Sequence, residues 1–368
     1  MRILSRRNRV LWVNSIGYRA PTASGADLRR AFRKVAAAAS PVREVEPNIF
    51  VLNPLAVPAY GSPLIRRFNR EFLRFQVRRA MRQLGFGRPL NWVFNPAAGL
   101  MAGGLNEKAI IYYCVDEYTA FSGVDTQALA DIEERLLERA DLVITSAERL
   151  QRSKSPFNPR TFMVRHGVDF QHFRKALDPE LEVPAEIRDL PRPLIGYFGL
   201  IAQDWVDLDL LGHVADRFPH GSLVMLGKIT TDVSGLERRP NVHLLGRKRY
   251  EDLPAYCKGF DAAVIPFPIS EVTLNANPLK AREYLAAGLP VVSTAIPEVE
   301  VLEHCLIGRD PEDFVRQLHR ALEEPGPRWD RSETMRDESW EARVETIRGL
   351  FASIAAAGSR NENQKEPS

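Results

Sequence analysis

The sequence predicts an α/β protein made of two doubly wound lobes that face a central cleft. Apolar runs of strand length alternate with helical patterns along the chain, as is typical of parallel sheets covered by helices. The 368 residues, 45% of them apolar and 26% charged, suffice for two domains that each bury a core. Between about residues 171 and 193 the pattern gives way to proline and charged residues, which indicates a linker.

The first lobe is expected over residues 1–172. Its predicted strands are 10–14, 109–114, 142–145 and 161–164, and its predicted helices are 26–39 and 126–140. The second lobe is expected over residues 173–338. Its predicted strands are 194–198, 222–226, 242–244, 262–266 and 290–293, and its predicted helices are 207–217, 251–258, 278–287 and 311–323. A last amphipathic helix is expected within 339–357, followed by a polar, disordered tail at 358–368.

The composition excludes several classes of protein. No apolar run approaches the roughly 20 residues that a membrane-spanning helix needs. The three cysteines are far apart in the sequence and lack the spacing of a metal site. We therefore expect no disulfide framework and a location in the reducing cytosol.

Charge is distributed unevenly along the chain. Residues 1–110 hold 19 Lys and Arg against 5 Asp and Glu, a net of +14, whereas the remainder holds 31 against 42, a net of −11. A cationic lobe attracts anions such as phospholipid headgroups or pyrophosphate, and it also attracts an acidic second lobe. A compositional drift without function is the alternative.

An anion site is predicted at the start of the helix near residue 278. Asn277 is expected to be its N-cap, with Pro278 at the first helical position, so that free amides and Lys280 face a phosphate. Glu283 lies three residues after Lys280 on the same side, where a carboxylate can accept hydrogen bonds from a ribose diol. The alternative is a capped helix with a solvated Lys–Glu pair, and the residues alone favour that alternative.

The stretch PLKAREYLAAGLPVVST, residues 278–294, resembles the donor-binding segment of GT-B glycosyltransferases of bacterial exopolysaccharide or cell-wall type. Further resemblances follow in the order of that family, from residue 109 onward. They are ADLVITS at 140–146, HGVD at 166–169, IGYFGLI at 195–201, NVHLLGRKRYEDLPAY at 241–256 and DAAVIPF at 261–267. The resemblance implies two Rossmann-like lobes, the first for the acceptor and the second for a nucleotide-sugar donor.

The resemblance also implies roles for individual residues. Glu283 would bind the ribose, and Lys280 with the amides around Leu279 would bind the diphosphate. Gly199 would let the backbone approach the donor, while Arg247 and Tyr250 would frame the base. Two positions depart from the family pattern: Asn275 stands in place of a Glu, and Leu200 stands in place of an Arg. Glu271 could take the role of the missing Glu, and Lys228 or Arg247 could take that of the missing Arg. No convincing acidic metal motif is present, so we expect no cofactor and no metal.

Asp116 is the best candidate for the base that deprotonates the acceptor hydroxyl. It follows the strand at 109–114, at a carboxyl end that should face the cleft, within a segment that resembles the acidic loop of such transferases. Glu117 is kept in reserve, and Gly17 and Arg19 are expected to border the cleft. A turn or helix-capping role for Asp116 is about equally compatible with the sequence. His166 is expected to be structural.

Residues 64–84 predict a cationic amphipathic helix. Phe68, Phe72 and Phe75 fall on one stripe. The adjoining face carries Arg70, Arg74 and Arg78. Such a helix can lie on an anionic leaflet, where each basic residue contributes about 1 kcal/mol. The alternative is that the phenylalanines pack on the core and the arginines are solvated.

These observations predict a metal-independent glycosyltransferase that moves a sugar from a nucleotide diphosphate, expected to be UDP, to a saccharide or lipid-linked saccharide in surface polysaccharide synthesis. We expect it in the cytoplasm, peripheral on the inner face of the cell membrane, with no nucleic-acid partner. The alternatives are a UDP-sugar 2-epimerase of the same fold and a non-catalytic nucleotide-sugar-binding scaffold.

Overall fold

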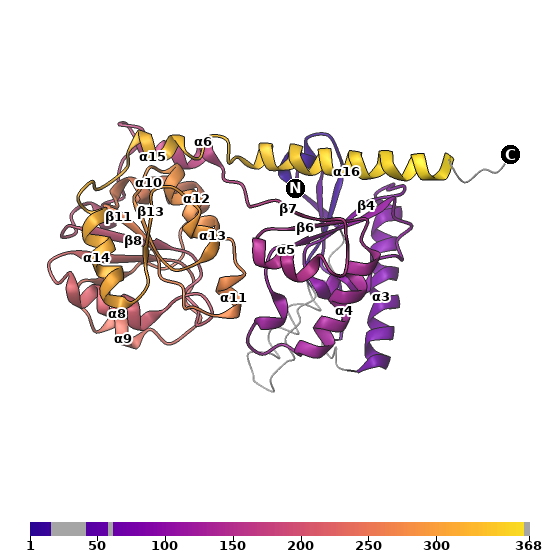
Figure 1. Ribbon diagram of the computed structural model, residues 1–368, viewed down its shortest axis with the longest axis horizontal. Helices are drawn as coiled ribbons and strands as arrows, with labels where there is room; N and C mark the ends of the chain where they lie inside the picture. Colours follow the sequence, from indigo (N-terminus) through magenta and orange to yellow (C-terminus); the bar gives the residue numbers. More distant parts are fainter. Residues whose placement is uncertain (16–41, 58–61, 364–368) are drawn as a thin grey trace. The chain divides into compact units, whose positions relative to one another are not determined.

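The chain forms two compact units. The computed structural model describes residues 1–15, 42–57 and 62–363, with side chains up to residue 354 (Figure 1). The first unit comprises Met1–Val164 and Val344–Ser368, and the second comprises Arg165–Arg343. The sequence instead places the boundary between the two lobes at residue 172 and assigns the last helix to a separate segment, 339–357. The predicted helix at 26–39 lies outside the described residues.

The described residues of the first unit form two sheets. In one, β1 (Val10–Val13) pairs parallel with β3 (Ile49–Leu52), which pairs antiparallel with β2 (Arg43–Glu46). The other sheet is parallel throughout and has the order β4 (Leu90–Val93), β5 (Ala109–Cys114), β6 (Leu142–Thr145) and β7 (Thr161–Met163). The last three strands of this sheet were predicted, whereas β2, β3 and β4 were not.

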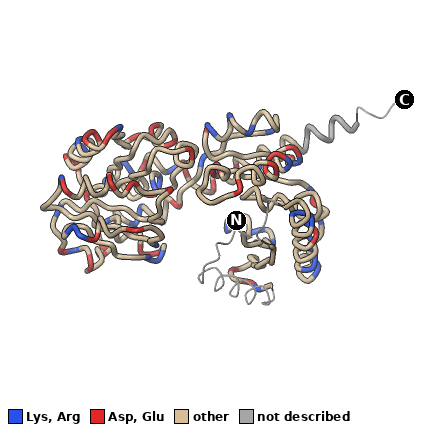
Figure 2. The backbone as a smooth tube through the Cα atoms, turned by 90° about the horizontal axis from the view of Figure 1, so that it is seen from below, with Lys and Arg blue, Asp and Glu red and all other residues tan. Residues whose placement is uncertain are grey.

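The helices of the first unit cover these sheets. They are α1 (Arg2–Ser5), α3 (Pro63–Gln83), η1 (Pro96–Leu100), η2 (Tyr118–Ala120), α4 (Thr126–Arg139), α5 (Glu148–Lys154) and α16 (Trp340–Asn363), which begins in the second unit. Asp125 caps α4 through the Ala128 amide, and the apolar stripe of α4 is buried as its periodicity predicts. Figure 2 shows basic residues following one another along α3.

The second unit is built on one sheet of six parallel strands. Their order is β10 (Val242–Leu244), β9 (Ser222–Leu226), β8 (Leu194–Phe198), β11 (Ala262–Ile265), β12 (Val291–Thr294) and β13 (Cys305–Gly308). The chain order along the sheet reverses between β8 and β11. In open α/β sheets this switch point leaves a crevice at the carboxyl ends of the strands, where ligands bind.

The second unit has twelve helical segments within its described residues. They are α6 (Phe170–Phe173), η3 (Arg174–Leu177), α7 (Ala185–Arg188), α8 (Leu208–Arg217), α9 (Ser234–Glu237), η4 (Tyr250–Asp252), α10 (Leu253–Gly259), α11 (Glu271–Leu274), α12 (Leu279–Ala286), α13 (Pro297–Glu300), α14 (Pro311–Ala321) and α15 (Trp329–Glu333). The segment predicted as a linker at 171–193 carries part of α6 with η3 and α7. Phe173 and Ile187 within it are buried in the core, so apolar anchors outweigh its proline and charge content.

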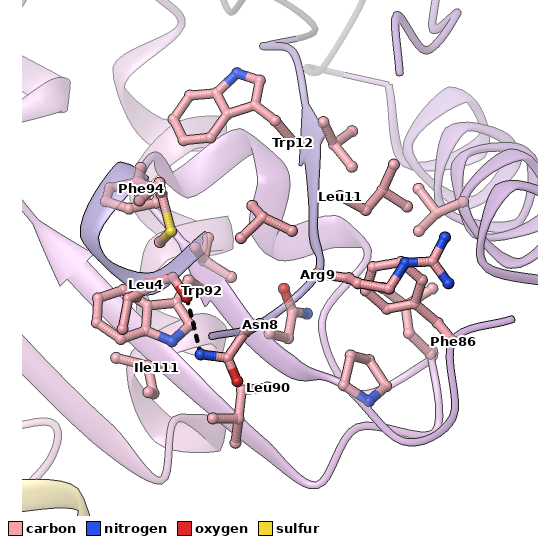
Figure 3. A pocket seen from close by; sticks show the side chains of 18 of the residues that line it. Leu4, Asn8, Arg9, Leu11, Trp12, Phe86, Leu90, Trp92, Phe94 and Ile111 are labelled. Atoms are coloured by element: carbon pink, nitrogen blue, oxygen red, sulfur yellow. Dashed lines mark hydrogen bonds between the residues drawn. The ribbon is translucent and has the colours of Figure 1, made fainter. Parts of the chain in front are cut away.

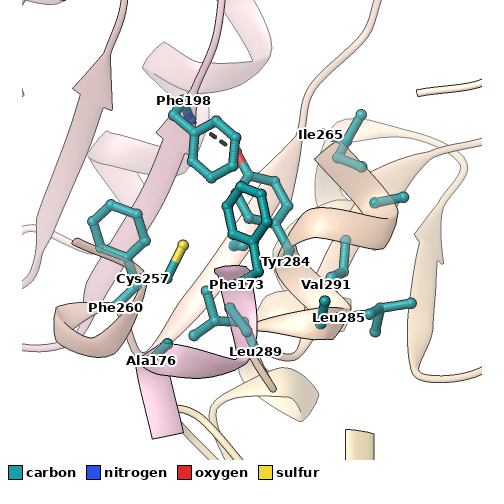
Figure 4. Packing of buried hydrophobic residues seen from close by; sticks show 14 of the residues in the cluster. Phe173, Ala176, Phe198, Cys257, Phe260, Ile265, Tyr284, Leu285, Leu289 and Val291 are labelled. Atoms are coloured by element: carbon teal, nitrogen blue, oxygen red, sulfur yellow. Dashed lines mark hydrogen bonds between the residues drawn. The ribbon is translucent and has the colours of Figure 1, made fainter. Parts of the chain in front are cut away.

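Aromatic packing fixes α12 against the sheet. Tyr284 packs edge-on against Phe198 with ring centroids 4.6 Å apart, and its hydroxyl accepts a hydrogen bond of 2.8 Å from the Phe198 amide (Figure 4). Phe173 stacks on the same Phe198 ring at 6.0 Å. This cluster places the first turn of α12 beside the carboxyl end of β8.

Candidate active site

The donor side of the site is the first turn of α12. The helix begins at Leu279, and Pro278 occupies the N-cap position with no capping side chain. Within the described part of the chain, no acceptor is present for the amides of Leu279 and Lys280. Two amide donors at a helix N-terminus form a site for an anion.

Asn277 is not the N-cap that the sequence predicts. Its buried side chain accepts a 2.7 Å hydrogen bond from Arg282 and donates one of 3.3 Å to Glu298. Pro278 follows directly, and a residue before proline is disfavoured in helical conformation. The helix therefore starts one residue later than predicted, and its first amides are left uncapped.

Lys280 lies over two aromatic rings at the carboxyl ends of β8 and β11. Its ammonium is 5.6 Å from the ring centre of Tyr197 and 5.5 Å from that of Phe267. Burial lowers the pKa of Lys280, and no carboxylate lies within 4.0 Å of its ammonium in the described part of the chain. A desolvated cation without a bound counter-ion is suited to holding an anionic ligand.

Glu283 lies one turn further along α12. Burial raises the pKa of its carboxyl to about 7, although nearby Lys280 acts in the opposite direction. Among the described residues, no side chain or amide donates a hydrogen bond to this carboxylate. The carboxylate can therefore accept hydrogen bonds from hydroxyl groups of a ligand.

Glycines bring three loops together at this edge of the sheet. Gly199, which follows β8, has φ +145°, and a Cβ on it would lie 2.2 Å from Cε of Lys280. A Cβ on Gly227, which follows β9, would lie 1.6 Å from the carbonyl oxygen of Gly199. The Gly227 amide donates to the carbonyl of Gly246, after β10, at 2.8 Å. The loops that carry Gly199, Arg247 and Tyr250 are thus adjacent, as a continuous donor site requires.

The predicted base-binding residues are exposed at this edge. Arg247 points into solvent, and the ring of Tyr250 stacks on His172 with centroids 4.5 Å apart. His172 also hydrogen-bonds the Tyr250 carbonyl at 2.9 Å. The sequence did not single out His172, because it lies in the segment interpreted as a linker. Tyr197 and Phe267 were also missed, although both fall inside the quoted IGYFGLI and DAAVIPF segments.

Asn275 and Leu200, the two positions that depart from the family pattern, differ in their burial. Asn275 is buried and donates a 2.7 Å hydrogen bond to the Glu271 carbonyl. Leu200 is 42% exposed after Gly199, and Lys228 is exposed after Gly227. Lys280 supplies the cation beside Gly199 that Leu200 does not.

Asp116 lies in the first unit, two residues after β5. Burial raises the pKa of its carboxyl to about 6, and no hydrogen-bond donor to that carboxylate is found among the described residues. Its loop is fixed on both sides: Cys114 Sγ approaches the Asp116 carbonyl at 3.5 Å, and Ser146 Oγ donates to the Val115 carbonyl at 3.0 Å. A carboxyl with a pKa close to neutral suits a general base.

Glu117 occupies a different environment from its neighbour. Its carboxylate pairs with Lys154 at 2.9 Å and accepts a 2.5 Å hydrogen bond from the Thr119 hydroxyl. Lys154 also pairs with buried Glu133 at 2.9 Å, and the Tyr112 hydroxyl donates to Glu133 at 2.5 Å. Glu117 therefore anchors the loop in a buried network.

Gly17, Arg19 and His166 are the remaining positions to which the sequence assigned a role. Gly17 and Arg19 lie outside the described residues. The Nδ1 atom of His166 lies 2.9 Å from the Asn277 carbonyl, and burial lowers the pKa of its ring to about 4. A neutral ring bonded to the segment before α12 fits a structural role.

Helix α3 carries the residues predicted to meet a membrane. Its buried face consists of Asn69, Leu73, Val77, Ala80 and Met81. Phe68 and Phe75 are 55% and 54% exposed, and Phe72 is partly exposed with its ring stacked on Phe68 at 5.5 Å. The phenylalanine stripe therefore faces away from the core, and the alternative that these rings fill the core is wrong for Phe68 and Phe75.

The arginines of α3 divide into two groups. Arg74 donates to the carbonyls of Met101 and Ala102, and Arg78 donates to that of Gly104. Both are occupied with the chain itself rather than free for a membrane, and Arg70 pairs with Glu71 at 3.0 Å. Arg67, Arg79 and Arg82 remain exposed on this helix.

The described ranges of the chain contain neither a metal-binding cluster nor a membrane-spanning helix. No group of three or more His, Cys, Asp or Glu there lies close enough to hold a metal ion. None of the helices in those ranges has both the length and the apolar character to cross a membrane.

Part of the chain matches a known protein family. Residues 192–324 match the family described as "Glycosyl transferases group 1". Over 259 residues the chain is 24% identical to TuaH of Bacillus subtilis (strain 168), which is named as a teichuronic acid biosynthesis glycosyltransferase. The alignment spans 64% of this chain and 64% of that relative.

Solved structures share the fold of the whole chain. Sucrose-phosphate synthase from Thermosynechococcus elongatus gives a TM-score of 0.67 at 17% identity, over 95% of this chain and all of that one. A UDP-forming trehalose-phosphate synthase from Burkholderia xenovorans gives 0.64 at 14% identity, over 94% of each chain. The predicted α/β architecture is confirmed: the chain has the GT-B fold, and residues 192–324 within it match the glycosyl transferases group 1 family.

Proposed function

We propose that the chain is a glycosyltransferase that moves a sugar from a UDP-sugar to a saccharide or lipid-linked saccharide in cell-surface polysaccharide synthesis. The observation that carries the proposal is the pair formed by Lys280 and Glu283. Both are desolvated, neither forms an ion pair within 4.0 Å among the described residues, and both adjoin the uncapped amides of α12. The teichuronic acid name of TuaH supports the surface-polysaccharide assignment.

The donor would bind along the edge formed by the β8, β9 and β10 loops. The amides of Leu279 and Lys280, with the Lys280 ammonium, would hold the diphosphate, and Glu283 would accept hydrogen bonds from the ribose diol. Arg247 and Tyr250 would frame the base. The amides and Lys280 offset the charge that develops on the leaving diphosphate, so this arrangement requires no divalent ion.

In the transfer step, Asp116 would take the proton of the acceptor hydroxyl. The acceptor oxygen forms a bond to the anomeric carbon while the bond from that carbon to the diphosphate oxygen breaks. The nucleoside diphosphate leaves with the bonding electron pair. The raised pKa of Asp116 makes the carboxylate a stronger base than an exposed aspartate while leaving it ionised above about pH 6.

The test supplies UDP-sugars to the purified protein with and without membrane extract as the source of acceptor, and measures UDP release. A transferase releases UDP in a manner that depends on the acceptor. An epimerase converts the donor without any acceptor, and a scaffold binds UDP without turnover; either result would refute the proposal.

A paired variant tests the donor site directly. Glu283→Ala should weaken UDP binding at least tenfold, because the ribose diol loses its acceptor. The matched control is Glu237→Ala, which removes an exposed carboxylate on α9 and should leave the dissociation constant unchanged. Equal affinities of wild type and Glu283→Ala would overturn the ribose assignment.

We also propose that α3 brings the protein to the inner face of the cell membrane. Leu64, Phe68 and Phe75 form an exposed apolar stripe, and Arg67, Arg79 and Arg82 supply exposed positive charge. A helix of this kind inserts its apolar side chains below anionic headgroups. Phe68→Ser with Phe75→Ser should abolish flotation with phosphatidylglycerol vesicles, whereas Val45→Ser and Val301→Ser, at exposed positions elsewhere, should not.

A further inference from the structure

A cavity lies within the first unit, and all the residues that line it belong to that unit. It has a volume of about 880 Å³ and lies between the β1–β3–β2 sheet and the β4–β5–β6–β7 sheet (Figure 3). Its walls come from α1, β1, the inner face of α3, β4 and α16. Its volume falls in the range of cavities that bind small organic ligands.

The body of the cavity is apolar. Met81, Val93, Ile111 and Ile347 line its depth and are buried, and the aromatic rings of Trp12, Trp92, Phe86 and Phe94 line its sides. Trp12 and Leu90 remain 38% and 44% exposed beside the opening. Hydrocarbon that entered the cavity would remove this apolar surface from water, at roughly 25 cal/mol per Å².

The charged residues that line the cavity are all arginines. They are Arg7, Arg9, Arg88 and Arg348, and no acidic residue belongs to the lining as far as the structure describes the chain. Arg7, Arg9 and Arg88 are exposed, and no carboxylate pairs with any of these three within the described residues. Arg9 also donates to the Leu84 carbonyl, and Arg88 donates to the Glu107 carbonyl at 3.3 Å, so each guanidinium keeps further N–H donors for an anion. Arg348 is paired with Glu345 at 2.6 Å. The opening is therefore cationic and the interior apolar.

We propose that this cavity binds an anionic amphiphile, with the hydrocarbon chain between the two sheets and the phosphate or carboxylate head at Arg7, Arg9 and Arg88. The apolar depth excludes a free sugar or nucleotide, and the arginines select against cationic and neutral amphiphiles. This site is distinct from the donor site and does not rest on the proposed transfer reaction. A prenyl phosphate and a phospholipid share the required chemistry.

Binding is measured by titration calorimetry on the full chain, without donor or acceptor. Dodecyl phosphate, kept below its critical micelle concentration, should bind with a stoichiometry of one. Dodecyltrimethylammonium and dodecanol should bind at least tenfold more weakly. Farnesyl phosphate and lauroyl lysophosphatidate form two further arms, and whichever binds more tightly identifies the natural source.

The location is tested by fluorescence quenching with 12-bromododecyl phosphate. Trp12 and Trp92 line the cavity, whereas the other tryptophans of the chain, Trp205, Trp329 and Trp340, belong to the second unit. Quenching should be saturable and should disappear in Trp12→Phe/Trp92→Phe. Quenching that persists in this double variant would place the amphiphile elsewhere and overturn the proposal.

Two variants distinguish the binding of the anionic head group from the binding of the hydrocarbon chain of the ligand. Arg7→Gln/Arg88→Gln should weaken dodecyl phosphate at least tenfold but leave dodecanol unaffected, and Arg43→Gln/Arg139→Gln is the control with the same loss of charge. Ala98→Phe, which adds a ring inside the cavity, should weaken every amphiphile. Because Ala98→Phe could perturb folding, the arginine pair decides the outcome. Equal binding of anionic, neutral and cationic amphiphiles, or no binding, refutes the proposal.

Discussion

Glu283 should make donor affinity depend on pH. Its carboxyl has a pKa raised by burial to about 7 in the free protein, and only the ionised form accepts charge-assisted hydrogen bonds from both hydroxyls of a ribose diol. Donor binding therefore lowers this pKa and releases a proton. At pH 6 about one tenth of the protein carries the carboxylate, so the donor dissociation constant should be about tenfold higher than at pH 8, or about 1.4 kcal/mol.

The assay is titration calorimetry with a UDP-sugar between pH 5.5 and 8. A UDP-sugar is preferable to UDP, because its diphosphate is blocked by the sugar and has no free terminal group to titrate in this range. At pH 7, buffers of different ionisation enthalpy should reveal the release of about half a proton.

Glu283→Gln is the control for other titrating groups, including Lys280, whose pKa is also perturbed. Its affinity should vary little over the same range of pH. If wild type and Glu283→Gln show the same pH dependence, the carboxylate does not contact the donor and the assignment is refuted.

Three further predictions concern stability and turnover. Because the pKa of Glu283 is raised in the folded state, this residue stabilises the fold less and less as pH rises from about 4.5 to 7. Glu283→Gln should therefore raise the free energy of unfolding at pH 8 by up to about 3 kcal/mol and leave it unchanged at pH 4. Urea denaturation at both pH values measures these free energies. Asp116→Asn should abolish turnover and leave the donor dissociation constant unchanged, and unaltered turnover would exclude Asp116 as the base. In the wild type, kcat/KM should decline below about pH 6, where the Asp116 carboxylate becomes protonated. Lys154→Met leaves the carboxylates of Glu117 and Glu133 unpaired and should cost about 3–5 kcal/mol of unfolding free energy, and a loss under 1 kcal/mol in thermal unfolding would contradict the buried network.

The sequence predicted the second unit better than the first. Its five predicted strands are all present because buried parallel strands read as continuous apolar runs, as in 222–226. The strand β13, CLIG, was missed because Gly308 and the flanking polar residues obscure so short a run. In the first unit β2, REVE, is mostly exposed and carries no apolar pattern, so periodicity could not reveal it.

The candidate site shows a similar division. The residues at the start of α12 alone favoured a capped helix with a solvated Lys–Glu pair, and the anion site was predicted because residues 278–294 resemble a donor-binding segment. The side-chain partner of Asn277, Arg282, could not be predicted, since that contact depends on how α12 packs. The same holds for α3, where helical periodicity could not distinguish Arg74, which is bound to carbonyl oxygens, from exposed Arg67.

The contact between Gly199 and Gly227 restricts how this protein can be re-engineered. A methyl group at Gly227 would overlap the carbonyl oxygen of Gly199, and Gly227 in turn is bonded to Gly246. A single transplanted loop from another transferase would collide with the two that stay behind. Attempts to change the sugar nucleotide accepted by this chain should therefore exchange the three segments as one cassette, and saturation mutagenesis at Gly227 should recover glycine alone.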